Sequence, residues 1–138
     1  MSGSAVSWGA TGMVKVLMRW MAVVVWMGVI FALSAIPSLA SPIEPIYDFI
    51  LRKLAHVTVY VVLTLLVYGA LRPHMARSTR AWLLAMLVAV LYACTDEWHQ
   101  TFVPGREGTV RDVAIDGLGV MGAWMVASVR RVQETWPR

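Results

Sequence analysis

The stretch WMAVVVWMGVIFALSAI, residues 20–36, contains no charged side chain. A transmembrane helix needs about 20 predominantly apolar residues. Lys15 and Arg19 stand just before the stretch, where the chain would leave the hydrocarbon. These features predict a membrane-spanning helix at about residues 20–37, with residues 1–18 as an N-terminal segment.

The same stretch has a competing interpretation as a secretory signal peptide. Basic residues precede the apolar region, and Ser38-Leu39-Ala40 resembles a small-residue cleavage site. The apolar region is longer than the usual 7–15 residues or so, and it begins late, at Trp20. We therefore expect the segment to be retained as a helix. Its removal would leave the topology of the remaining helices unchanged.

Three further apolar runs follow along the chain, at residues 54–71, 81–95 and 113–129. At 1.5 Å per residue the middle run covers only about 23 Å, less than a hydrocarbon core of about 30 Å. Its helix must therefore continue through Asp96 and Glu97. We predict further helices at about residues 54–71, 81–100 and 112–129. The proline-containing stretch at residues 38–45 is predicted to be a loop.

The composition agrees with a membrane protein and excludes other classes. The chain has 138 residues, of which 59% are hydrophobic and 14% charged. A soluble domain this small could not bury so much apolar surface, and a disordered chain would be more polar. The only cysteine, Cys94, excludes an internal disulfide framework. The expected fold is all-α, with four antiparallel transmembrane helices in a compact bundle forming one domain over residues 1–138.

The charges are divided unequally between the two sides of such a bundle. One side carries most of the basic residues: Lys15, Arg19, Arg72, Arg77, Arg80, Arg130, Arg131 and Arg138. The other side carries most of the acids together with four basic residues, Arg52, Lys53, Arg106 and Arg111. Loops rich in Lys and Arg remain in the cytoplasm. We therefore expect a multi-pass protein of the bacterial inner membrane with both termini in the cytoplasm. The net charge of +4 is explained by these loops, so no nucleic-acid partner is expected.

Ionisable residues gather at the ends of three predicted helices, namely at His56, Asp96, Glu97, Asp112 and Asp116. Because the helices alternate in direction, these side chains are expected at the same membrane depth. Ionisable groups inside a membrane are expensive and usually face the bundle interior with a partner.

Helical spacing sharpens this expectation, because residues three or four apart share a face. By this rule the candidate site residues form three stripes: Lys53, His56 and Tyr60, then Asp96 and Gln100, then Asp112 and Asp116. Glu97 is rotated by about 100° from Asp96, so the two cannot point the same way. Structural ion pairing within the bundle is the main alternative to a functional site.

The motifs resemble those of the VanZ-like family of bacterial membrane proteins. The resemblance covers about residues 45–125 and includes K-x-x-H-x-x-x-Y from Lys53 and D-E-x-x-Q-x-F-x-P-G-R from Asp96 to Arg106. The family usually continues D-x-x-x-N-x-x-G, whereas here Asp116 stands in the place of the asparagine. The resemblance implies a small multi-pass protein, and some members are linked to resistance to glycopeptide antibiotics such as teicoplanin.

Two functional hypotheses follow. In the first, the outward polar site binds or shields a lipid-linked cell-wall precursor, or a glycopeptide bound to it. The chemical reason is that an arginine side chain can donate two parallel hydrogen bonds to a phosphate or carboxylate group. Its binding residues would be Lys53, His56, Tyr60, Asp96, Glu97, Gln100, Arg106, Asp112 and Asp116. In the second, the chain is a membrane-embedded hydrolase or transferase for such a lipid, with His56, Asp96 and Glu97 as candidate general acids and bases. A proton- or ion-coupled transporter is a third interpretation, because carboxylates and histidine relay protons, but it would need an oligomer.

No cofactor or metal is expected. Residues 117–122 match G-x-G-x-x-G, but they lie inside an apolar helix rather than after a strand. His56, Asp96, His99 and Asp112 are candidate metal ligands without a recognised metal-binding spacing. The expected partners are therefore membrane lipids and the envelope ligand.

Overall fold

The structure is a computed structural model that describes residues 10–37, 45–106 and 108–135. These residues form the helices α1 (Ala10–Ser34), α2 (Pro45–Leu71), α3 (Ser78–Gln100) and α4 (Val110–Thr135), with a 3-10 helix η1 (Arg72–His74) between α2 and α3. The described part of the chain has no strand. The predicted all-α class is therefore confirmed.

The helices extend beyond the apolar runs from which they were predicted. α1 begins at Ala10, within the expected N-terminal segment, and α2 begins at Pro45 rather than near residue 54. The predicted starts were too late because charged side chains end an apolar run without breaking a helix. Proline suits the first turn of a helix, where its missing N–H has no intrahelical partner. Residues 38–44, which hold most of the predicted loop and the cleavage-site motif, lie outside the described residues.

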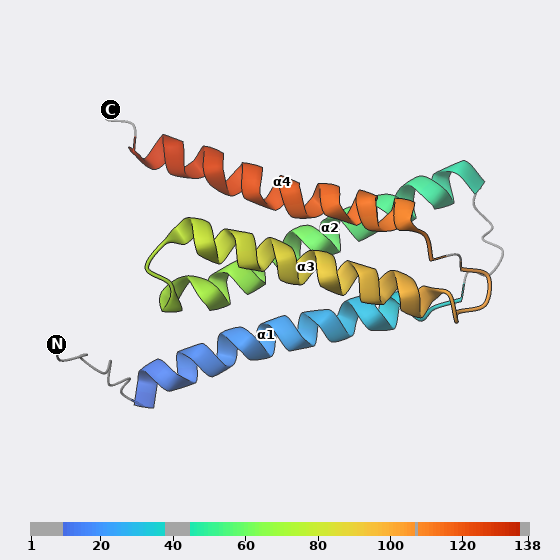
Figure 1. Cartoon of the computed structure of the whole chain (residues 1–138). Coiled ribbons are helices and arrows are strands. Elements are labelled where there is room, and N and C mark those ends of the chain that lie inside the picture. Colours follow the sequence, from blue (N-terminus) through green and yellow to red (C-terminus); the bar gives the residue numbers. More distant parts are fainter. Residues whose placement is uncertain (1–9, 38–44, 107, 136–138) are drawn as a thin grey trace.

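α2 lies at the centre of the bundle and packs against α1, α3 and α4. Successive helices alternate in direction, so α2 and α4 run parallel (Figure 1). One end of the bundle holds the end of α1, the start of α2 and the connection from α3 to α4. We call this the polar end, because the buried acids lie there. The start of α1, η1 and the end of α4 lie at the opposite end (Figure 1).

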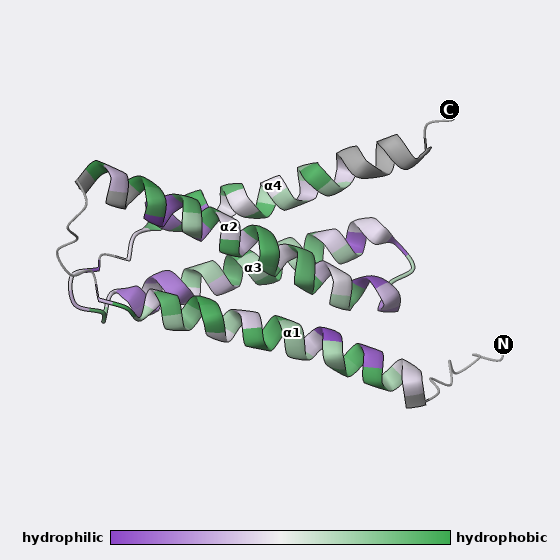
Figure 2. Ribbon diagram, turned by 180° about the vertical axis from the view of Figure 1, so that it is seen from behind, coloured by the Kyte–Doolittle hydropathy of each residue, from purple (hydrophilic) through white to green (hydrophobic). Residues whose placement is uncertain are grey.

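Apart from Trp82, the buried apolar residues of α3 are alanines, and its leucines are exposed. Its buried stripe begins with alanines at Ala81, Ala85, Ala89 and Ala93, whereas Leu83, Leu87 and Leu91 are 62%, 52% and 57% exposed. A soluble protein would bury the leucines, but in a membrane lipid surrounds them and the alanines let helices approach closely. Figure 2 shows hydrophobic residues along the helices and the most hydrophilic ones toward the helix ends.

Three helical segments in the described part of the chain are long and apolar enough to cross a membrane, at Thr11–Ser34, Ile50–His74 and Ser78–Gln100. The chain is therefore a multi-pass membrane protein. All four helices contribute to the buried core between them, and α2 supplies its largest side chains, Tyr60, Leu63 and Val67 among them. α4 approaches α2 closely at Gly119, where an added Cβ atom would lie 2.4 Å from the carbonyl oxygen of Val57.

Candidate functional site

The buried acids of the described chain all lie at the polar end. Asp96, Glu97 and Asp116 are 2%, 4% and 1% exposed, and Gln100 beside them is 4% exposed. They come from the last turns of α3 and the first turns of α4. Burying an acid is costly unless it is paired and hydrogen-bonded, so the partners of these groups define the site.

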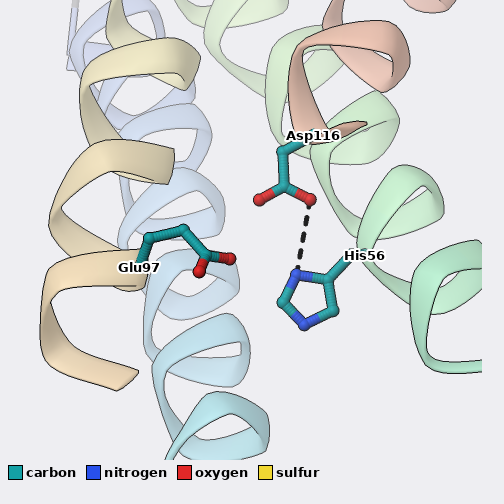
Figure 3. Close-up of side chains that lie close together, drawn as sticks. All are labelled: His56, Glu97 and Asp116. Atoms are coloured by element: carbon teal, nitrogen blue, oxygen red, sulfur yellow. Dashed lines mark ion pairs between the residues drawn. The ribbon is translucent and has the colours of Figure 1, made fainter. Parts of the chain in front are cut away.

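Two ion pairs join the first half of α2 to the first turns of α4. Lys53 pairs with Asp112, and His56 Nδ1 lies 3.3 Å from Asp116 Oδ1. Because α2 and α4 run parallel, residues one turn apart on α2 meet residues one turn apart on α4. Figure 3 shows His56 and Asp116 facing each other. Their side chains are 17% and 1% exposed, whereas those of Lys53 and Asp112 are 24% and 18% exposed.

Glu97 approaches the His56–Asp116 pair from α3. The ligand atoms of His56, Glu97 and Asp116 all lie within 4.8 Å of one another, and their side chains point toward a common centre (Figure 3). Glu97 Oε2 accepts a hydrogen bond of 3.2 Å from the backbone N–H of Thr109, and its Oε1 accepts one of 3.3 Å from Gln100 Nε2. Thr109 also caps α4, because its Oγ1 accepts the backbone N–H of Asp112.

Asp96 turns toward α1 instead. Its Oδ2 accepts hydrogen bonds from Ser34 Oγ at 2.7 Å and from Gln100 Nε2 at 3.1 Å. The side-chain amide of Gln100 therefore links Asp96 to Glu97. Asp96 therefore faces Ser34 on α1, whereas Glu97 faces His56 and Asp116, as the rotation of about 100° between adjacent residues of a helix requires.

Arg106 connects the α3–α4 segment to the end of α1. It donates from Nη2 to the carbonyl of Leu33, from Nε to that of Ile36, and from Nη1 to Gln100 Oε1, at 3.2, 3.0 and 3.3 Å. Carbonyls at the end of a helix lack intrahelical partners, and basic side chains often satisfy them.

Two glycines allow the segment around Arg106 to fold closely against α3. Gly105 has a φ of 74°, a left-handed conformation that favours glycine. A Cβ atom on Gly108 would lie 1.9 Å from the carbonyl oxygen of Glu97, so only glycine fits there.

A cavity of about 240 Å³ opens between α1 and α2 at the polar end. Its polar lining consists of Ser34, Arg52, His56 and Arg106, and its apolar lining includes Ile30, Ala55 and Val59. Cationic side chains therefore stand beside an apolar surface. His56 belongs both to this cavity and to the His56–Asp116 pair.

A comparison with protein families identifies the chain. The family model VanZ/LLP1 matches residues 16–131. The chain belongs to the VanZ/LLP1 family. No curated protein and no solved structure gives a significant match.

The residues predicted from the VanZ-like motifs all lie at or next to the polar end. His56, Glu97 and Asp116 meet between α2, α3 and α4, with Lys53 and Asp112 beside them. Asp96, Gln100 and Arg106 form the second group, against α1. Tyr60 is fully buried one turn after His56, and its hydroxyl has no hydrogen-bond partner among the described residues.

One residue of this candidate site was not predicted. Ser34 lies in the apolar run of α1, where a serine carries no signal of its own. Arg52 was expected on the outer side, four residues before His56 and partly on the same face of α2. It lines the cavity together with His56.

Proposed function

We propose that this VanZ-family protein spans the bacterial inner membrane four times and binds an anionic amphiphile of the cell envelope. The observation that carries the proposal is the cavity between α1 and α2. Arg52 and Arg106 line it together with the apolar residues of both helices. A guanidinium group suits phosphate or carboxylate, and the apolar lining suits a hydrocarbon chain.

The size and place of the cavity favour a lipid rather than a small soluble anion. About 240 Å³ holds a phosphate-sized group and the first carbons of a chain. The remaining chain would lie along the lipid-facing surface of the bundle. We therefore favour a polyprenyl-linked cell-wall precursor as the ligand. Binding that shields such a precursor from a glycopeptide would give a role in antibiotic resistance.

The proposed topology rests on α4 and on the charge distribution. α4 has 26 residues, comparable with 25 in α1 and 27 in α2, and it runs alongside α2. A fourth span brings the basic N-terminal, η1 and C-terminal segments to one side, which the positive-inside rule assigns to the cytoplasm.

Reporter fusions test the topology. Fusions after His74 and at Arg138 are expected to behave as cytoplasmic, and a fusion after Thr101 is expected to behave as exported. A reporter that fluoresces only in the cytoplasm and a phosphatase that is active only outside it give opposite signals. An exported signal at Arg138 would contradict the four-span topology with both termini in the cytoplasm.

A membrane-embedded hydrolase or transferase is the second candidate, and one contact favours it. Ser34 Oγ lines the cavity and donates a hydrogen bond of 2.7 Å to Asp96 Oδ2. A hydroxyl beside a carboxylate that can accept its proton is the arrangement of an activated nucleophile. In that case the bound lipid would be a substrate.

Lipid retention separates the two candidates. We expect anionic lipid to co-purify with the wild-type protein, and Arg52→Ala to reduce the amount retained by about tenfold, since a hydrogen-bonded charge contact is worth about 1.5–3 kcal/mol. Mass spectrometry of the purified protein measures the retained lipid. Arg80→Ala is the matched control, because Arg80 is an exposed arginine at the opposite end of the bundle.

The outcomes of this comparison are distinct. Equal retention by wild type, Arg52→Ala and Arg80→Ala would contradict ligand binding at the cavity. If the wild type converts the retained lipid to a product, and Ser34→Ala retains the lipid without converting it, the protein is an enzyme and not only a binding protein.

A further inference from the structure

His56, Glu97 and Asp116 bring three potential metal ligands together from three different helices. One imidazole nitrogen of His56 and one carboxylate oxygen from each of Glu97 and Asp116 lie within 4.8 Å of one another. The separation between His56 Nδ1 and Asp116 Oδ1 is 3.3 Å. Two ligand atoms on a tetrahedral zinc ion, with bonds of about 2.0 Å, are also about 3.3 Å apart. The separations that involve Glu97 are at most 4.8 Å, so a modest side-chain adjustment would complete the set.

The second observation concerns the other oxygen of Asp116. Asp116 is 1% exposed, and its Oδ2 has no hydrogen-bond partner among the described residues. Figure 3 shows this oxygen on the side of the carboxylate toward Glu97, not toward His56. A buried carboxylate oxygen needs a donor or a cation, and such orphaned atoms are rare in folded proteins.

A second carboxylate oxygen nearby also lacks a donor. Oδ1 of Asp96 is buried without a hydrogen-bond partner among the described residues. Glu97 and Asp116 repel each other when both are ionised, and one imidazolium can balance only one of them. Lys53 pairs with Asp112, one turn before Asp116 on α4. A divalent cation between Glu97 and Asp116 would balance both charges at once.

We propose that His56, Glu97 and Asp116 form a binding site for a divalent transition-metal ion of the zinc class. One imidazole and two carboxylates suit zinc, whereas calcium and magnesium prefer all-oxygen ligands and copper(I) prefers thiolates. The ion would take the place of the hydrogen bond between His56 and Asp116. The ligands are far apart in sequence, so no spacing motif marks the site.

The site lies directly behind the proposed lipid cavity, because His56 contributes to both. Three protein ligands leave one position of a tetrahedral ion open, as in catalytic zinc sites. The metal site does not depend on the lipid proposal, since its ligands and their geometry are independent of the arginines.

A zinc titration of the full-length protein tests the proposal. The protein is purified in detergent without a histidine tag, stripped with a chelator, and titrated with zinc alone in a calorimeter. We expect one zinc ion per chain and a higher melting temperature with zinc. Glu97→Gln and His56→Ala are expected to bind zinc at least about tenfold more weakly, as losses at metal sites typically are.

The control is His99→Gln, which removes a histidine that packs against the ring of Phe31 outside the site. This variant should bind zinc as the wild type does. Circular dichroism confirms that each variant is folded, and Glu97→Gln preserves the size of the side chain. No stoichiometric zinc in the wild type, or equal affinity in Glu97→Gln, would overturn the proposal. Zinc is the only ligand added in the titration, so zinc binding is measured whether or not the retention experiment finds lipid.

Discussion

Asp116→Leu is expected to lower the free energy of unfolding by about 3–5 kcal/mol, and the double variant His56→Leu/Asp116→Leu is expected to recover much of that loss. Removing one partner of a buried ion pair leaves the other buried and uncompensated, whereas replacing both by apolar residues is often neutral. His56 and Asp116 are 3.3 Å apart, with side chains 17% and 1% exposed. Chemical unfolding in detergent with a chelator present measures the pair without a metal.

Asp112→Leu is the matched control on the same helix. Its pair with Lys53 is more exposed, with side chains 18% and 24% accessible. Partly exposed ion pairs contribute about 0–1 kcal/mol, so this variant should be much less destabilised. If Asp116→Leu costs no more than Asp112→Leu, the His56–Asp116 pair does not hold the bundle together. The role of the pair would then be to bind a ligand rather than to stabilise the bundle.

The same experiment addresses the main alternative to a functional site. If the pair has only a structural role, the double variant should be stable and should bind lipid and zinc as the wild type does. A functional site predicts that the double variant is stable but binds neither lipid nor zinc. Measuring stability and binding on one set of variants therefore separates the two roles of His56 and Asp116.

The helical class and the family were predictable because they depend on local patterns. Apolar runs longer than any soluble protein of this size could bury indicate membrane helices, and the motif from Asp96 to Arg106 indicates a VanZ-like protein. Both are confirmed. Helix ends were less predictable, because a charged residue such as Lys15 or Arg52 interrupts the apolar pattern but can still lie within a helix. α1 and α2 both continue through these residues.

The pairing of the site residues was not predictable, because it depends on how the helices are rotated. Glu97 lies one turn beyond Ala93 on the buried alanine stripe of α3, which was a signal for its inward orientation. The direction of Asp96 toward Ser34 and the capping of α1 by Arg106 require the packed α1. Such contacts join residues more than 60 positions apart, and no local pattern specifies them.

Gly119→Ala is expected to destabilise the protein by about 1–3 kcal/mol, the usual cost of overpacking. The added Cβ atom would lie 2.4 Å from the carbonyl oxygen of Val57, and this backbone atom cannot rotate away. α4 must therefore move away from α2. Since Asp116 is one turn before Gly119, we expect the same shift to separate Asp116 from His56 and to weaken binding at the site.

Gly122→Ala is the matched control, and the sign of its effect should be opposite. A Cβ atom at Gly122 has nothing within 4 Å, and alanine within a helix is more favourable than glycine by about 0.5–1 kcal/mol. Unfolding in detergent should therefore show a loss of stability for Gly119→Ala and a small gain for Gly122→Ala. Equal effects at the two positions would mean that α2 and α4 do not meet at Gly119. The parallel pairing of α2 with α4, from which the His56–Asp116 contact follows, would then be wrong.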